Sequence, residues 1–404
     1  MANFSYTAKS LDGHIQKGTS EAENIRELAQ SLKTEGMILV KADYIVKRGG
    51  GRFEIPFLRG KVSLNEKILM TRNLSVMVST GLPLVKGFSI LSAQAKSKRM
   101  KYALLDIGQE ISKGRSLSDS LKKYPDIFSE LFLGMIIAGE ESGTMEDVLK
   151  VLALQLEKEK EMNSKLQKAL IYPGILLATM LIVGIFLMIF VLPKINVFFK
   201  SLHADLPLTT KIILGSGDFF ANYWYFLTGG VLIIILIFTA LIRTKNGRFI
   251  IDTVMIKTPL VSSLVKKSNV AALIRSLSSL LSAGVPLLKS LEITSGTVGN
   301  SYFKKALYDA GKKIEKGEKL FSSLKPHREI FPYGAIEMIE IGEETGKTSV
   351  ILKRLAEFYE DEVSSAAENL SVIIEPVLIV IMGLLVGIFA VSIIGPLYSV
   401  LGNV

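Results

Sequence analysis

The chain has 404 residues, of which 49% are hydrophobic and 21% are charged, so a membrane protein with large polar domains fits this composition better than a soluble globule. Cysteine is absent, which excludes disulfides, thiol catalysis and thiolate metal sites. The three histidines, His14, His203 and His327, lie far apart without metal-ligand spacing, so neither a metal site nor a cofactor is predicted.

The net charge of +10 is distributed unevenly along the chain. Of the 48 Lys and Arg residues, 26 precede the first apolar segment and 19 follow the second; only Lys194, Lys200 and Lys211 lie between them. This asymmetry is the positive-inside pattern of membrane proteins. Basic runs interleaved with aromatic residues are missing, so direct nucleic-acid binding is not predicted.

Residues 1–46 are typical of a small α+β module. Polar and apolar residues alternate around the turn signal Asp12-Gly13, which predicts a hairpin. A helix over 21–35, ended by Gly36, and a third strand over 37–46 follow. The start lacks the apolar core of a signal peptide, so we expect the N-terminus to stay in the cytoplasm as a docking module.

A basic linker, 47–62, leads to a polar helical segment, 63–168. Ser63 and Glu66 have capping-box spacing, in which each side chain satisfies the backbone donor of the other residue. We expect a bundle of five or six helices without strands, with a break at Gly81-x-Pro83. The glycines expected near the ends of further helices are Gly114 and Gly139.

Residues 72–193, which run from this segment into the first apolar stretch, have a second copy at residues 275–396, displaced by 203 positions without a gap. A constant register over such a length indicates one structural unit used twice. The second copy predicts a second helical bundle over 243–371. The paired residues include Arg72 with Arg275, Gly81 with Gly284, Pro83 with Pro286, Gly143 with Gly346, Glu157 with Glu360 and Pro173 with Pro376.

Three apolar segments predict transmembrane helices over 169–193, 219–242 and 372–397. Each contains more than the roughly 18 to 20 residues that a helix needs to cross the hydrocarbon layer. With a cytoplasmic start, three spans place both bundles in the cytoplasm and export 194–218 and the C-terminus, 398–404. The predicted fold class is a mostly α membrane protein with two homologous cytoplasmic bundles and a small N-terminal α+β module.

The segment from Gly342 to Thr348 resembles a phosphate-binding loop but fails as one. Three residues instead of four separate its glycines, an apolar strand does not precede it, and two carboxylates would repel phosphate. Gly143 and Gly346 instead suit left-handed helix ends. The acidic pairs beside them either face water, form an electrostatic contact, or bind a divalent ion weakly between subunits. These pairs are Glu140 with Glu141 and Glu343 with Glu344.

Arg72 and Arg275 lie among apolar positions of their helices. Each either packs helices together through a salt bridge or contacts a partner. Pro173 and Pro376 fall near the starts of their predicted spans, where a helix tolerates a proline kink.

Glu375 precedes Pro376 and differs from its counterpart, Tyr172. A carboxylate is tolerated at the membrane interface, so Glu375 either faces the headgroups or contacts another subunit or a substrate. Gly383-x-x-x-Gly387 has the spacing that lets two spans approach closely.

Taken together, these motifs resemble the polytopic inner-membrane platform proteins of type II secretion systems and type IV pili, the GspF/PilC family. Met70 departs from the aromatic residue usual before Thr-Arg. The matching motifs are Phe4-x-Tyr6, Asp12-Gly13, Thr71-Arg72-x-Leu74, Gly81-Leu82-Pro83-Leu84, the two Gly-Glu-Glu-Ser/Thr-Gly turns, Tyr172-Pro173, Leu206-Pro207-Leu208, Asn222-Tyr223-Trp224 and Glu375-Pro376 through Pro396.

The resemblance implies a non-enzymatic membrane homo-oligomer between a cytoplasmic assembly ATPase and a pilin or pseudopilin fibre, alongside other inner-membrane assembly proteins in the lipid bilayer. A small transporter or channel subunit is the competing class, because internal repeats and interrupted spans occur there. Against it, three spans with few ionisable residues supply few groups to line a pathway.

Overall fold

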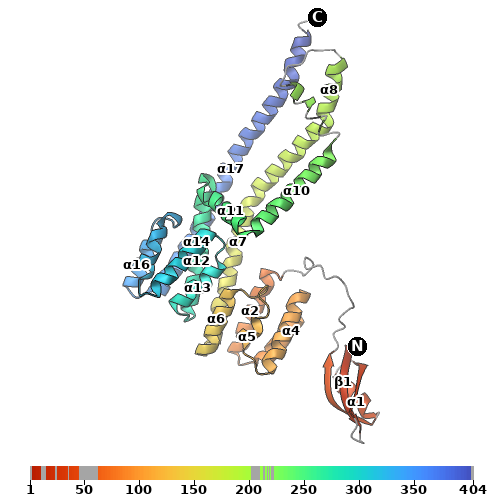
Figure 1. Cartoon of the computed structure of the whole chain (residues 1–404), viewed down its shortest axis with the longest axis vertical. Helices are drawn as coiled ribbons and strands as arrows, with labels where there is room; N and C mark the ends of the chain where they lie inside the picture. The colour runs from red at the N-terminus through yellow and green to blue at the C-terminus, as the bar shows by residue number, and fades with distance from the viewer. Residues whose placement is uncertain are drawn as a thin grey trace. The chain divides into compact units, whose positions relative to one another are not determined.

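The computed structural model describes residues 2–10, 15–22, 25–34, 36–44, 62–201, 210–212, 214–215, 217, 219 and 223–401. The chain divides into two compact units, Met1–Gly60 and Lys61–Val404. Figure 1 shows their helices and strands.

The first unit is a three-stranded antiparallel sheet with one helix against it. The strand order is β2-β1-β3, and Ala8, Leu28 and Leu32 are buried between sheet and helix. The sequence predicted a helix from residue 21, but the strand pairing continues to Ala22, which is buried. Asp12-Gly13 and residues 45–60 lie outside the described residues. The elements are β1 (Ala2–Ser10), β2 (Ile15–Ala22), α1 (Ile25–Thr34) and β3 (Met37–Tyr44).

The first bundle contains six helices, as predicted. Serine caps begin four of them, because a serine side chain can accept from the unpaired backbone N–H groups of the first turn. The fully buried Phe88, Met100 and Ile107 form part of one core. The helices are α2 (Leu64–Ser79), α3 (Leu84–Gln94), α4 (Lys98–Ser112), α5 (Leu117–Leu121), α6 (Glu130–Ser142) and α7 (Met145–Phe186).

The predicted capping box is half right. Ser63 accepts from the backbone N–H of Glu66 at 3.2 Å. The Glu66 carboxylate, however, accepts from the backbone N–H groups of Lys96 and Ser97, at 2.9 Å each. Glu66 therefore ties the start of α2 to the start of α4, a contact that local sequence spacing does not encode.

The second bundle repeats the turns of the first. Gly81 and Gly284 have φ of 74° and 82°, and Pro83 and Pro286 each begin the next helix. A positive φ strains residues with a side chain, so these breaks need glycine. The elements are α12 (Pro259–Ser282), α13 (Leu287–Thr297), α14 (Ser301–Ile314), α15 (Leu320–Leu324), the 3₁₀ segment η3 (Lys325–Ile330), α16 (Ala335–Glu344) and α17 (Thr348–Leu401).

Gly139 does not end a helix, contrary to the prediction. It and its counterpart Gly342 lie inside α6 and α16, where the following helix passes closely. A Cβ on Gly139 would lie 3.1 Å from Cγ2 of Val148, and one on Gly342 would lie 3.2 Å from Cβ of Ile351. Both helices end instead beside Gly143 and Gly346, which have φ of 71° and 66°.

Among the described residues, two helical runs are long and apolar enough to cross a membrane, Met145–Phe199 and Thr348–Val391. The first contains α7, one π-turn, η2 (Leu187–Val191), and α8 (Leu192–Ser201); the second belongs to α17. α7 and α17 pack against each other where they leave the bundles. Figure 1 shows their apolar parts extending away from the bundle cores. Their predicted spans expose large apolar side chains, as lipid-facing helices do.

The predicted middle span overlaps a 20-residue apolar helix, α10 (Trp224–Arg243). It is followed by α11 (Lys245–Lys257). The middle span, and with it the count of three, therefore stays a prediction. The predicted exported loop begins within α8, and most of its remainder lies outside the described residues.

Candidate functional site

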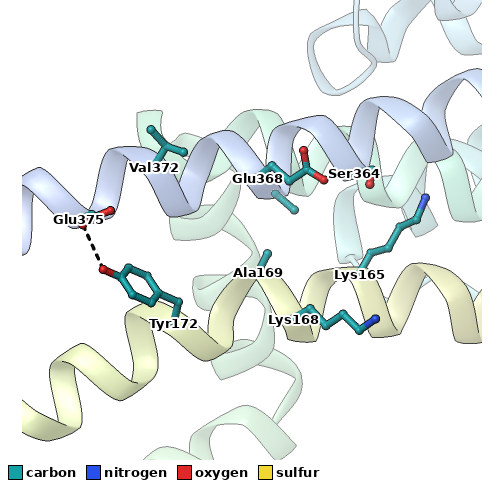
Figure 2. Close-up of a pocket in the computed structure, with 9 residues that line it drawn as sticks. Lys165, Lys168, Ala169, Tyr172, Ser364, Glu368, Val372 and Glu375 are labelled. Atoms are coloured by element: carbon teal, nitrogen blue, oxygen red, sulfur yellow. Dashed lines mark hydrogen bonds between the residues drawn. The ribbon is translucent and has the colours of Figure 1, made fainter.

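A cleft opens between α7 and α17 where the charged parts of both helices give way to their apolar parts. Its volume is about 510 Å³. Lys165 and Lys168 contribute two ammonium groups from α7, and Glu368 and Glu375 contribute two carboxylates from α17 (Figure 2). The cleft is therefore lined by charges of both signs at the entrance to the predicted spans.

The two repeats meet in this cleft at equivalent positions. The Tyr172 hydroxyl donates to Oε1 of Glu375 at 3.1 Å, and these residues are 203 positions apart (Figure 2). Each directly precedes the proline within its helix, Pro173 or Pro376. The sequence identified Glu375 and Tyr172 as counterparts but did not predict their bond. Hydrogen bonding satisfies polar groups that would otherwise be costly beside lipid.

Metal chemistry finds no support in this cleft. Across the described residues, no group of three or more His, Asp and Glu side chains could hold a metal ion. The cleft instead offers two cations and two carboxylates for electrostatic contacts.

Arg72 and Arg275 form the same ion pair in their respective bundles. Arg72 Nε lies 2.5 Å from Oε1 of Glu157, and Arg275 Nε lies 2.5 Å from Oε1 of Glu360. Glu157 and Glu360 are themselves repeat counterparts. The sequence signal available for this pairing was that the arginine and the glutamate both recur 203 positions later. The ion pair joins the first helix of each bundle to its last.

Of the alternatives left open for the acidic pairs, a position facing water does not describe the first glutamate of either pair, which is half-buried. Glu140 accepts from the backbone N–H groups of Leu117 and Ser118, at 2.6 and 3.2 Å. Glu343 accepts from Leu320 and Phe321, at 2.7 and 2.8 Å. Both therefore cap a short helix, α5 or α15, where a carboxylate satisfies unpaired donors.

The second glutamate of each pair, Glu141 or Glu344, is exposed as predicted. Gly383 and Gly387 also lie open, because a Cβ at either position would meet no atom within 4 Å. The close helix approach that their spacing suggests is thus not made within the described part of the chain.

Duplicated helical bundles whose last helices continue into exposed apolar segments define an integral membrane protein with two polar arms. Comparison with known proteins agrees. The family model for the type II secretion system protein F matches residues 70–193 and 273–396, and the model for the N-terminal domain of that protein matches residues 1–43. These matches cover more than half of the chain, which belongs to the type II secretion system protein F family.

Curated relatives carry two kinds of name. The chain is 31% identical to the type IV pilus assembly protein PilC of Thermus thermophilus over 100% of this chain and 99% of the relative. It is 35% identical to PilC of Pseudomonas aeruginosa, over 85% and 92%. It is 30% identical to the type II secretion system protein F of Vibrio cholerae, over 95% and 94%.

Proposed function

We propose that this protein is a non-enzymatic inner-membrane platform that couples a cytoplasmic assembly ATPase to the assembly of a pilin or pseudopilin fibre. The proposal rests on family membership, on relatives named for pilus assembly and secretion, and on the two polar arms joined to apolar helices.

The continuity of α7 and α17 is the observation that carries the coupling. α7 begins in the first bundle, where Val148, Leu149 and Leu152 are buried, and continues unbroken for 42 residues to Phe186. At about 1.5 Å per residue, such a helix is about 63 Å long. α17 does the same for the second bundle over 54 residues. A displacement of either bundle is therefore transmitted along a helix to the membrane.

The proposed topology keeps both bundles and the N-terminal module in the cytoplasm and the C-terminus outside. α10 is the middle span, since the second copy can return to the cytoplasm only through a second crossing. The proposed partners are the ATPase, pilin or pseudopilin, other inner-membrane assembly proteins and further copies of this chain.

Crosslinking in cells tests these partners. A photoreactive residue at Tyr102 on α4 or at Tyr308 on α14, both exposed, should capture the ATPase. The same residue at Ile182, exposed in the apolar part of α7, is the matched position and should capture pilin or pseudopilin instead. Capture of neither protein at any exposed position of the bundles and spans would overturn the proposal.

Two activity measurements separate the competing classes. The purified chain should not hydrolyse ATP, because the Gly342 segment lacks a phosphate-binding loop. Vesicles that contain the chain should show no ion or solute flux beyond that of empty vesicles. Hydrolysis by the chain alone would indicate an enzyme, and flux would favour the transporter class.

A further inference from the structure

The two bundles contact each other through surfaces that are not equivalent. The first bundle contributes face A, on α6 and α7, and the second contributes face B, on α12 and α13. Ser279 Oγ of face B donates to Oε1 of Gln155 of face A at 2.7 Å, and both side chains are buried. Ile293 of face B packs against Gly134 of face A and joins the core of the first bundle.

Since the bundles are repeats, each also carries the other face. The first bundle has a face B on α2 and α3, and the second bundle has a face A on α16 and α17. Val76 stands at the position of Ser279 and Phe358 at the position of Gln155. Their exposed fractions are 62% and 55%, whereas Ser279 and Gln155 are both 7% exposed. Among the described residues of the unit Lys61–Val404, these second faces are therefore open.

The open faces match each other chemically. The internal contact pairs two hydrogen-bonding side chains, and the equivalent open positions hold two apolar ones, so both members differ in the same sense. Single exposed apolar residues are ordinary on protein surfaces. Two that occupy the two sides of one repeated contact instead indicate that they meet.

The charged residues also differ between the internal contact and the open faces. Lys158 and Arg275 line one cavity between the bundles, and both are cations. At the equivalent open positions, Asp361 replaces Lys158, while Arg72 corresponds to Arg275. Arg72 exposes 64% of its side chain and Asp361 is also exposed, so opposite charges would face each other when the open faces meet.

The open face A differs from the internal face A at one position that controls how closely the helices can approach. Glu337 stands where the first bundle has Gly134, and it lies 2.8 Å from the Arg328 guanidinium within its own bundle. A side chain there prevents the closest approach that Gly134 allows for Ile293. Contact between the open faces is therefore centred on Val76 and Phe358.

We propose that face A of the second bundle binds face B of the first bundle in another copy of this chain, so that copies associate head to tail. The inference deepens the proposed platform function by naming the surfaces through which copies assemble. Repetition of a head-to-tail contact yields a ring or an open array. Since the spans keep every copy in one membrane plane, the proposal favours a ring.

Cysteine crosslinking tests this contact directly, because the natural chain has no cysteine. Val76→Cys and Phe358→Cys are placed on separate chains with different tags, co-expressed and oxidised in membranes. A disulfide needs Cβ atoms roughly 3.5 to 4.5 Å apart, so a heterodimeric product reports proximity. The expected result is a product that carries both tags, and a ladder of products when both cysteines are on one chain.

Controls separate this contact from other associations. Each single variant expressed alone should give little product, since its cysteine faces a different residue of the neighbour. Tyr102→Cys with Tyr308→Cys is the matched exposed pair and should also give little product. Equal crosslinking by one variant alone would show a symmetric contact and overturn the proposal. So would a monomeric chain, or an oligomer in which the mixed pair never crosslinks.

Charge exchange supplies an independent measurement. Phe358→Asp should weaken association of the purified chain on the order of tenfold, as expected for loss of a central apolar contact. Asp361→Arg should also weaken it. Arg72→Asp together with Glu157→Arg in the same chain, which keeps opposite charges at both positions of the ion pair in the first bundle, should restore it. Failure of the restoration while crosslinking persists would overturn the charge pairing. The chain is expressed in cells without the ATPase for all these experiments, so their failure is distinguishable from failure of the ATPase crosslinks.

Discussion

The two bundles have the same internal architecture but occupy different surroundings. Both use a left-handed glycine at the same break, a glutamate that caps a short helix, and an arginine that joins the first helix to the last. Yet the Arg72 side chain is 64% exposed and that of Arg275 only 8%, because Arg275, on α12, lies where the second bundle meets α7 of the first. The two repeats thus share the same ion pair, while the neighbours of each copy determine how deeply the pair is buried and how much it contributes to stability.

A second difference lies in an ionic cluster that only the first bundle has. Glu110 is buried and paired with Lys113, Arg115 and Lys123. Its counterpart in the second bundle is Lys313. The hydrogen bonds from Lys123 and Lys113 lower the pKa of Glu110 to about 2.

The largest expected effect is the difference in stability lost when each of the two arginines is replaced. Arg275→Ala should destabilise the protein by about 3–5 kcal/mol, because Glu360 is left as a buried charge without its partner. Arg72→Ala should lower the stability by only about 0–1 kcal/mol, as for exposed ion pairs. The thermal unfolding midpoint of the full chain in detergent measures both. Equal shifts would show that burial of Arg275 does not decide the difference.

A smaller effect should be shared by both copies. Gly139→Leu and Gly342→Leu should each destabilise by about 1–3 kcal/mol, because the new side chain meets the next helix. Leucine favours helices, so helix propensity does not cause the loss. Gly174→Leu, at a helical position with no atom within 4 Å of a Cβ, is the control in the same unfolding measurement. A loss of stability from only one of the two variants would mean that the close helix contacts at Gly139 and Gly342 differ.

Replacing the two capping glutamates should lower the stability by modestly different amounts. α5 also has Ser116, which accepts from the backbone N–H of Asp119 at 3.1 Å, whereas Lys319 gives α15 no side-chain cap. Glu343→Ala should therefore destabilise by about 1–2 kcal/mol and Glu140→Ala by less. Glu344→Ala and Glu141→Ala, at exposed neighbours, should leave the unfolding midpoint nearly unchanged. A larger loss for Glu140→Ala would contradict this ranking.

The last prediction concerns how stability depends on pH, which Glu110→Gln should change. The folded pKa lies below the ordinary value of 4.5, so the stabilisation is present above pH 4.5 and is lost as the pH falls toward 2. Glu110→Gln should flatten the fall of the unfolding midpoint in this range. Lys313→Gln is the matched control and should keep the natural slope. An unchanged slope for Glu110→Gln would assign the acid sensitivity to other groups.

Sequence patterns predicted the helices of the bundles and the glycine breaks well, because periodicity and turn chemistry act over a few residues. The Arg72–Glu157 pair spans 85 positions, and the sequence suggested a salt bridge for each arginine without naming its partner. Glu66, Glu140 and Glu343 were misplaced for a related reason. Each bonds to backbone groups 22 to 31 residues away, and backbone donors leave no mark in the sequence.

The sequence by itself determined the duplication, the polar arms and the apolar segments, since register, charge and hydrophobicity are properties of the chain alone. Only the tertiary structure decided how the copies meet. Tyr172 and Glu375 touch at equivalent positions in the cleft, while the bundles touch through the unlike faces A and B. The common register of the repeats does not reveal that asymmetry, because it depends on which neighbour each face finds after folding.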